Sequence, residues 1–208
     1  MCLRTKYAHK TNKLMAIGVM RHKTVVRRLQ TIKKGVSIAL LTMFSMGLYA
    51  YAYDEPSEEQ VKAAFIFNFA KFVEWPNTSF DNENYLNLCI AGQDKVELAL
   101  RNLERREVQG HMLKITALND EPNQSKLKNC HILFVARSEK NRQPQWLNAV
   151  EQQPILTIAD NLDLVKQGGM ISLYLEAQRV QFVVNQSGTQ SNGLKLSARM
   201  LQLARVPK

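Results

Sequence analysis

The sequence of 208 residues contains only three cysteines, nine glycines and six prolines. So few cysteines exclude a small domain held by many disulfides, and so few glycines and prolines exclude a collagen-like repeat. The chain does not lack residues for a core, because 45% of it is hydrophobic and 22% is charged. The composition is that of a globular protein, and the length suits about one domain.

Acidic residues are absent from residues 1–52, whereas ten lysines and arginines lie there. The whole chain has 28 basic and 18 acidic residues and a formal net charge of +10. In residues 53–208 the remaining 18 basic residues are therefore balanced by all 18 acidic ones. The basic excess belongs to the N-terminal segment alone, so it does not indicate a partner that is a nucleic acid.

A long hydrophobic run is also missing from this segment. A lysine pair closes its basic part, residues 35–48 are uncharged and mostly apolar, and residues 50–52 read Ala-Tyr-Ala. The apolar run is shorter than the ~20 residues that span a membrane, and the order of the parts is that of a secretory signal peptide. We expect residues 1–52 to be cleaved, leaving residues 53–208 as a periplasmic domain with no integral membrane segment.

Other interpretations of this leader stay open. Residues 1–52 are long for a signal peptide, and a start at Met20 would make residues 1–19 an over-extended translation start. Arg27 and Arg28 suggest a twin-arginine signal, although nothing downstream resembles a prefolded cofactor domain. An uncleaved anchor is a further alternative, against which the small residues at the cleavage position argue.

Two cysteines, Cys89 and Cys130, remain after the leader is removed. In an exported protein such a pair suggests a single disulfide. A cross-link over their 41-residue separation would stabilise the fold by about 4 kcal/mol in the chain-entropy model. Two buried thiols are the alternative, because free cysteine is often buried.

The domain begins with a capping box, Ser57 to Gln60, and apolar residues follow at helical spacing. This pattern predicts a helix over residues 58–74, which Trp75 and Pro76 end. Extended and helical patterns then alternate along the chain. Strands are expected at 85–91, 113–118, 131–136, 155–159, 170–176 and 179–185, and helices at 94–104, 138–152, 161–167 and the end of 194–206.

The strand pattern defines the fold class. Residues 131–136 are apolar on both strand faces, which is typical of a sheet covered on both sides. The last two strands, around Ala177 and Gln178, form a hairpin and make the sheet mixed. We expect a single α/β domain, with a mixed, mostly parallel sheet, helices on both faces, and a C-terminal β-hairpin plus helix.

Catalytic and metal-binding motifs are missing outside the leader. His111 and His131 are the only histidines in residues 53–208. No serine-hydrolase, zinc-protease or P-loop pattern is present there. Cys130 and His131 are neighbours in an expected strand, so their side chains should point to opposite faces. Gly168 and Gly169 lack the context of a dinucleotide-binding loop. The sequence therefore predicts no enzyme, no metal site and no cofactor.

The first expected helix carries a possible contact surface. Its broad apolar face contains Asn68, and its opposite face carries Ala63, Phe67, Ala70 and Lys71. An aromatic residue flanked by alanines on an outward face is typical of a contact with a partner protein or a second copy of the chain. The alternative is a helix covered on both sides by its own domain.

Several blocks of the sequence resemble the YfiR family of exported bacterial proteins, over nearly all of residues 57–206. The blocks are 61–65, 68–76, 88–92, 130–135, 154–158, 168–171, 180–185 and 193–201. The resemblance implies a periplasmic α/β domain that represses a membrane-anchored diguanylate cyclase, lowering cyclic di-GMP and restraining biofilm formation. It also implies dimerisation and cysteine redox control. Cys89 and Cys130 match the family's paired cysteines, so the resemblance further implies that they form a disulfide.

Members of the family sit beside different partners, so another membrane sensor protein is an alternative target. A small-ligand-binding module that serves a sensor kinase or a transport receptor is a further alternative. Its ligand would lie at the carboxyl ends of the strands, as in open α/β sheets. The candidate ligand-binding residues are Asn68, Gly168, Gly169 and Asn185.

Overall fold

The computed structural model describes residues 55–80, 84–119 and 121–205. The expected leader and the alternative start at Met20 lie outside these ranges. Within them, no helix is both long enough and apolar enough to cross a membrane.

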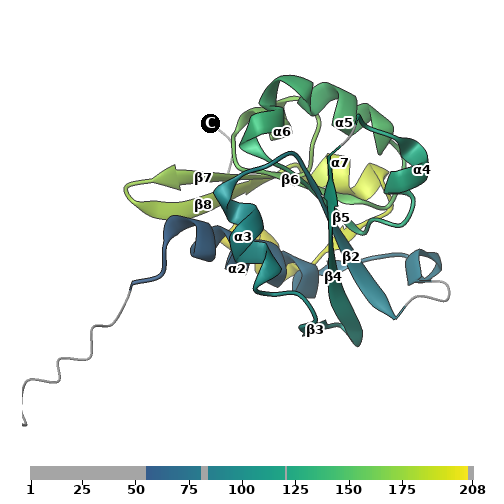
Figure 1. Ribbon diagram of the computed structural model, residues 1–208, viewed down its shortest axis with the longest axis horizontal. Helices are drawn as coiled ribbons and strands as arrows, with labels where there is room; N and C mark the ends of the chain where they lie inside the picture. The colour runs from purple at the N-terminus through teal and green to yellow at the C-terminus, as the bar shows by residue number, and fades with distance from the viewer. Residues whose placement is uncertain (1–54, 81–83, 120, 206–208) are drawn as a thin grey trace, which may run out of the picture. The chain divides into compact units, whose positions relative to one another are not determined.

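The helices and strands alternate as the sequence predicted (Figure 1). The helices are α2 (Glu58–Phe72), α3 (Lys95–Arg101), α4 (Gln124–Leu127), α5 (Gln143–Ala149), α6 (Asp163–Lys166), α7 (Gln186–Ser191) and α8 (Ala198–Leu203), with 3-10 turns η2 (Asn77–Phe80) and η3 (Arg137–Arg142). The strands are β1 (Val73–Glu74), β2 (Tyr85–Ala91), β3 (Glu107–Val108), β4 (His111–Leu118), β5 (Ile132–Val135), β6 (Leu156–Ala159), β7 (Ile171–Glu176), β8 (Arg179–Val184) and β9 (Lys195–Leu196).

Seven strands form one sheet in the order β3-β4-β2-β5-β6-β7-β8. The pairs from β4 through β2, β5 and β6 to β7 are parallel, and the two outer pairs, β3–β4 and β7–β8, are antiparallel. The prediction of a mixed, mostly parallel sheet with a terminal hairpin is confirmed. Because β4 and β5 lie on opposite sides of β2, the strand order reverses between β2 and β5, where open α/β sheets usually bind ligands.

Helices cover both faces of this sheet, as expected, and two separate cores result. Alternate strand residues such as Leu88 and Phe134 join α2, α3 and α8 in the larger core. Their neighbours, such as Cys89 and Leu133, join α4, α5 and α6 in the smaller one. Figure 1 shows the second set of helices above the sheet and α2 with α3 below it.

The capping box at the start of α2 is confirmed. The Ser57 hydroxyl accepts from the Gln60 N–H at 3.3 Å, and the Gln60 side chain accepts from the Ser57 N–H at 2.9 Å. The helix ends two residues earlier than predicted, because Val73 is extended and pairs with Leu196 in β9. The Gln109 side chain then donates to two carbonyl oxygens at the end of the helix, those of Ala70 and Val73, both at 2.8 Å.

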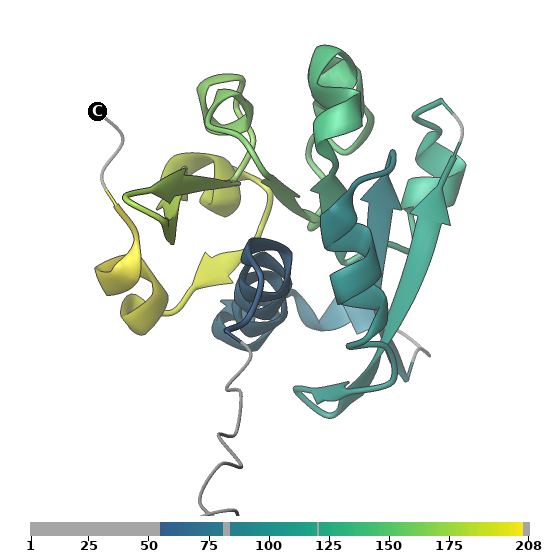
Figure 2. The same ribbon diagram turned by 60° about the vertical axis from the view of Figure 1, so that its left-hand side comes forward.

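The outward placement of Ala63 and Ala70 on α2 is wrong. They are 2% and 0% exposed and lie in the larger core, whereas Asn68, expected within the apolar face, is exposed. The reason is that α2 is enclosed by the sheet, by α3 and by the C-terminal segment (Figure 2), and the small alanines allow these elements to approach closely. Phe67 is half-buried and Lys71 is exposed, so only these two retain the expected orientation.

The helix expected over residues 138–152 is divided. Residues Arg137–Arg142 form η3, and α5 begins only at Gln143, with Pro144 in its first turn. Proline has no N–H to donate to a preceding turn, but the first turn of a helix does not need that donor. The proline therefore sets the start of α5.

The β7–β8 hairpin gives a stability prediction. Ala177 and Gln178 both have positive φ, 47° and 60°, in the two-residue turn that favours asparagine followed by glycine. Replacing them together by Asn and Gly should raise the free energy of unfolding by about 1 kcal/mol, because an ordinary side chain is strained in this region. Urea unfolding measures the change. Gln202→Gly in α8 is the matched control and should instead lower stability by about 1 kcal/mol, since glycine weakens a helix.

Candidate functional site

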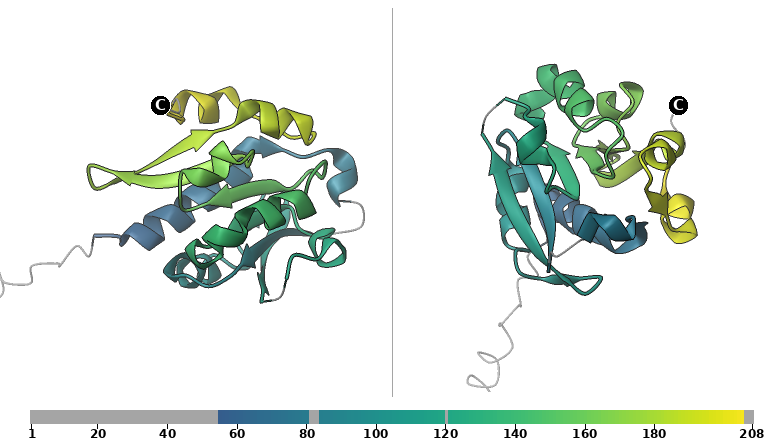
Figure 3. Two further views of the ribbon diagram at one scale, coloured as in Figure 1. Left: turned by 90° about the horizontal axis from the view of Figure 1, so that it is seen from above. Right: turned by 90° about the vertical axis from the view of Figure 1, so that its right-hand side faces the viewer.

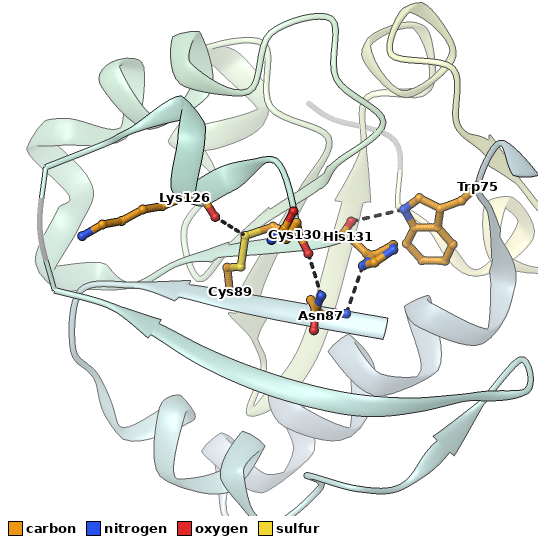
Figure 4. Close-up of a disulfide and its surroundings, with 7 residues drawn as sticks. Trp75, Asn87, Cys89, Lys126, Cys130 and His131 are labelled. Carbon is orange, nitrogen blue, oxygen red and sulfur yellow. Dashed lines mark hydrogen bonds between the residues drawn. A yellow bond between two sulfur atoms is a disulfide. The ribbon is translucent and has the colours of Figure 1, made fainter. Parts of the chain in front are cut away.

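Cys89 and Cys130 form a disulfide in the structure (Figure 4). Cys89 lies in β2 and Cys130 comes two residues before β5, with a Cα–Cα distance of 5.8 Å. Both are nearly buried, at 3% and 5% exposed, within the smaller core. The bond ties the α4–β5 connection to β2, and the Cys130 N–H donates to the carbonyl oxygen of Leu127, the last residue of α4, at 2.8 Å.

His131 points away from the disulfide, as the alternation along an extended chain predicted. The Asn87 N–H donates to its Nδ1 at 3.0 Å, and its Nε2 lies 2.9 Å from the Ser79 carbonyl oxygen. A backbone N–H can only donate and a carbonyl can only accept, so the ring is neutral with its hydrogen on Nε2. Phe80 stacks on this ring at 4.5 Å, and the Trp75 Nε1–H donates to the His131 carbonyl at 3.2 Å. The ring thus fixes η2 to the sheet instead of activating a thiol.

A buried ion cluster lies at the carboxyl ends of β5 and β6. Lys62 of α2 and Asp160, which follows β6, are 2% and 6% exposed, and their Nζ and Oδ1 atoms are 2.6 Å apart. Arg137, which follows β5, reaches the other Asp160 oxygen at 2.8 Å, and Glu58 also contacts Lys62. The cluster anchors α2 to the sheet. No local pattern indicates this cluster, because Lys62 is one charged residue among several on its helix.

The crevice at the strand-order reversal is filled by the chain itself. The Gln93 N–H donates to the Ser138 hydroxyl at 3.0 Å, and Asp94 accepts from the Arg137 N–H at 3.4 Å. Gly92 has a φ of +81°, and a Cβ there would lie 2.5 Å from Glu139 Cγ and Ser138 Oγ. These contacts leave no room for a ligand between the two loops, where the fold class would place one.

Three of the four candidate ligand-binding residues lie together, but at the other edge of the sheet. The Asn185 side chain donates to the Gly168 carbonyl at 3.3 Å and accepts from the Gly188 N–H at 3.0 Å, and Gly169 follows Gly168. Gly168 lines a pocket of about 570 Å³. We expected these residues at the carboxyl ends of the parallel strands, and this is wrong. Gly168 and Gly169 precede the parallel strand β7, and Asn185 follows the antiparallel β8, so the group lies at the amino ends. Asn68 is on α2, exposed to solvent.

Glu139 is a buried carboxylate in η3, just before α5. Arg142 binds both of its oxygens at 2.8 Å, and the Trp146 Nε1–H donates to one of them at 2.9 Å. The Arg142 guanidinium, followed by the Trp146 indole, holds the pKa of Glu139 below its ordinary value, although burial opposes this. Its contribution to stability is therefore complete above the ordinary glutamate pKa and is lost as the pH falls through the lowered pKa.

Within the described ranges, no group of three or more histidine, cysteine or acidic side chains is placed to hold a metal ion. Four groups of interactions define the candidate site: the disulfide, the His131 network, the ion cluster around Lys62 and Asp160, and the Glu139–Arg142 pair. The first three join separate elements of the fold, whereas Glu139 and Arg142 both lie in η3 and Trp146 links Glu139 to α5.

Comparisons with known proteins give one family. Residues 59–205 match the model of a family described as YfiR/HmsC-like. A solved structure, a conserved domain protein from Vibrio cholerae O1 biovar El Tor strain N16961, is 11% identical with a TM-score of 0.49. The match covers 73% of this chain but only 60% of that one. No curated protein matches.

Proposed function

Because the chain belongs to the YfiR/HmsC-like family, we propose that it represses an inner-membrane diguanylate cyclase by binding the cyclase's periplasmic portion. Membership of the family supports a regulatory role in the periplasm in general. The family match over residues 59–205 is the observation that carries the proposal. Repression of the cyclase would lower cyclic di-GMP and restrain biofilm formation.

The geometry of the described residues supports binding over catalysis. The only cysteine–histidine neighbours diverge, and the crevice at the strand-order reversal is closed by loop contacts. An inhibitor that acts by contact needs a rigid scaffold and a surface patch, and it needs no catalytic dyad. The disulfide and the two cores supply the scaffold.

We place the contact for a partner or a second copy of the chain at Phe67 and Lys71. They lie one turn apart on α2, and the Lys71 Nζ lies 4.6 Å from the centre of the Phe67 ring. Phe67 is half-buried against the larger core, so its ring is already ordered before binding. An ordered aromatic ring beside a cation is a common anchor at protein interfaces, because little side-chain entropy is lost.

A capture experiment tests the proposal. The exported domain should recover a diguanylate cyclase from solubilised inner membranes, and Phe67→Glu and Lys71→Glu should each lower recovery about tenfold or more. Cellular cyclic di-GMP should rise in parallel. Leu98→Glu is the matched control, because Leu98 is 68% exposed on α3, and it should leave recovery unchanged.

Two outcomes count against this proposal. A folded Lys71→Glu variant that captures the cyclase as well as the parent would show that the contact lies elsewhere. Recovery of another membrane sensor protein in place of a cyclase would redirect the repressor role to that protein. Size-exclusion chromatography of the same variants tests the proposed homodimer.

Cysteine redox control is part of the proposal. The disulfide fixes the α4–β5 connection to β2, so oxidation should favour the binding-competent form. Reduction would lower the population of that form, and the apparent affinity for the partner would fall with it. Repression should therefore weaken when the disulfide is reduced or removed.

The pocket lined by Gly168 favours a second candidate function. Its wall includes several amides and hydroxyls, from residues such as Asn148, Gln152, Ser191 and Asn192. A ligand-binding module that serves a sensor kinase or transport receptor would keep a metabolite there. Native mass spectrometry of the purified protein should then show an added mass, whereas a pure contact regulator shows none.

A further inference from the structure

A groove runs along the carboxyl end of β4, on the α4–α5 side of the sheet. Two hollows of about 370 Å³ and 550 Å³ lie there. They form one groove, because they share four lining residues: Asn119, Glu121, Asn123 and Lys126.

The floor of the groove is apolar. It is made by Leu118 at the end of β4, Leu127 of α4 and Trp146 of α5, all of which belong to the smaller core. Thr116, also in the lining, pairs with Cys89 in the β2–β4 ladder. The floor therefore adjoins the disulfide.

The rim of the groove presents an oriented guanidinium. Arg142 uses Nε and Nη2 to bind the buried Glu139, each at 2.8 Å, so its plane is fixed. Its Nη1 faces the groove, where it donates to Glu121 at 3.1 Å. Glu121 is 82% exposed, and an exposed ion pair of this kind contributes little to stability.

We propose that this groove binds a small carboxylate with an apolar body. The ligand's carboxylate takes the place of Glu121 on Nη1 of Arg142, and its apolar body lies over Leu118, above the covered side chains of Leu127 and Trp146. Glu121 shows that a carboxylate fits there, and Glu139 keeps the guanidinium in place when Glu121 leaves.

This site goes beyond the proposed repressor function, because binding requires neither a partner nor reduction of the disulfide. The floor shares its core with Cys89 and Cys130, so a ligand there stabilises the same packing that the disulfide cross-links. A carboxylate in the periplasm would thereby become an input to the protein.

Calorimetric titration of the exported domain with phenylacetate, and with the uncharged phenylacetamide, tests the proposal. Phenylacetate should bind, and phenylacetamide should bind about tenfold more weakly, since it loses the charge-assisted contact with Arg142. Glu121→Gln should tighten phenylacetate binding several-fold, because the competing carboxylate is gone. Glu151→Gln is the matched control, since this exposed carboxylate lines a different pocket, and it should change nothing.

Arg142→Gln should weaken phenylacetate binding about tenfold, and its thermal unfolding must be measured because Glu139 loses its partner. If that variant is unstable, Glu121→Gln decides the matter, because Glu121 is too exposed to affect folding. Equal affinity for the acid and the amide would overturn the proposal. A Glu121→Gln variant that binds phenylacetate no more tightly than the parent would also overturn it. So would the absence of phenylacetate binding by both the parent and this variant at about 10 mM ligand. None of these results bears on the capture of the cyclase, which is tested separately by the variants at Phe67 and Lys71.

Discussion

Cys89→Ser and Cys130→Ser should each lower the free energy of unfolding by about 4 kcal/mol, and the double variant should lose no more than either single one. Each substitution opens the same loop, which spans a 41-residue separation, so the entropy of the unfolded chain rises once. Urea unfolding under oxidising conditions measures the loss. The parent protein in excess dithiothreitol is the control, and it should unfold with the variants.

The same variants test redox control. If each single variant loses stability but all repress the cyclase as the parent does, the disulfide is only a structural cross-link. If no variant changes stability or repression, the redox proposal fails altogether. A double variant that loses twice as much as a single one would mean that each cysteine stabilises the fold separately, by packing.

Asp160→Asn should cost about 3 kcal/mol or more, because it leaves Lys62 buried without its full counter-charge. The exposed Arg137 loses its partner too, but water can solvate it. Lys62→Met should cost less, since Asp160 keeps its ion pair with Arg137. The double variant should recover part of the loss, because no charge is then buried beside an uncharged group.

A double-mutant cycle by urea unfolding measures this coupling. Glu58→Gln is the control, because Glu58 is partly exposed, and it should cost less than about 1 kcal/mol. Costs that simply add for Lys62 and Asp160 would show that the pair is not coupled in solution. The anchoring of α2 would then have to come from its apolar contacts alone.

Local signals predicted the fold well. The capping box at Ser57 located the start of α2, and strands that are apolar on both faces indicated a sheet covered by helices on both sides. These features depend on neighbours within a few residues along the chain. The burial of α2 could not be predicted in the same way, because alanine fits both a tightly packed face and an exposed one. Only the surrounding elements decide that Ala63 and Ala70 are inside.

The candidate sites were predicted only in part, for a related reason. The pairing of Cys89 with Cys130 followed from export and from the resemblance to a family. Gly168 and Asn185 are in contact, but the end of the strands at which they lie depends on strand directions that spacing does not reveal. The contact of Lys62 with Asp160, and of Arg142 with Glu121, joins residues with no shared local pattern.

The covering of α2 by the last elements of the fold has a consequence for synthesis. Val73 pairs with Leu196, Phe72 accepts from the Ser197 N–H, and Arg205 pairs with β8, so the C-terminal segment closes the larger core (Figure 3). Until those residues have left the ribosome, α2 has nothing to pack against on that side. The larger core therefore cannot be completed before residues 195–205 have been synthesised and released from the ribosome. That delay would suit the export through a translocase that we expect for this protein.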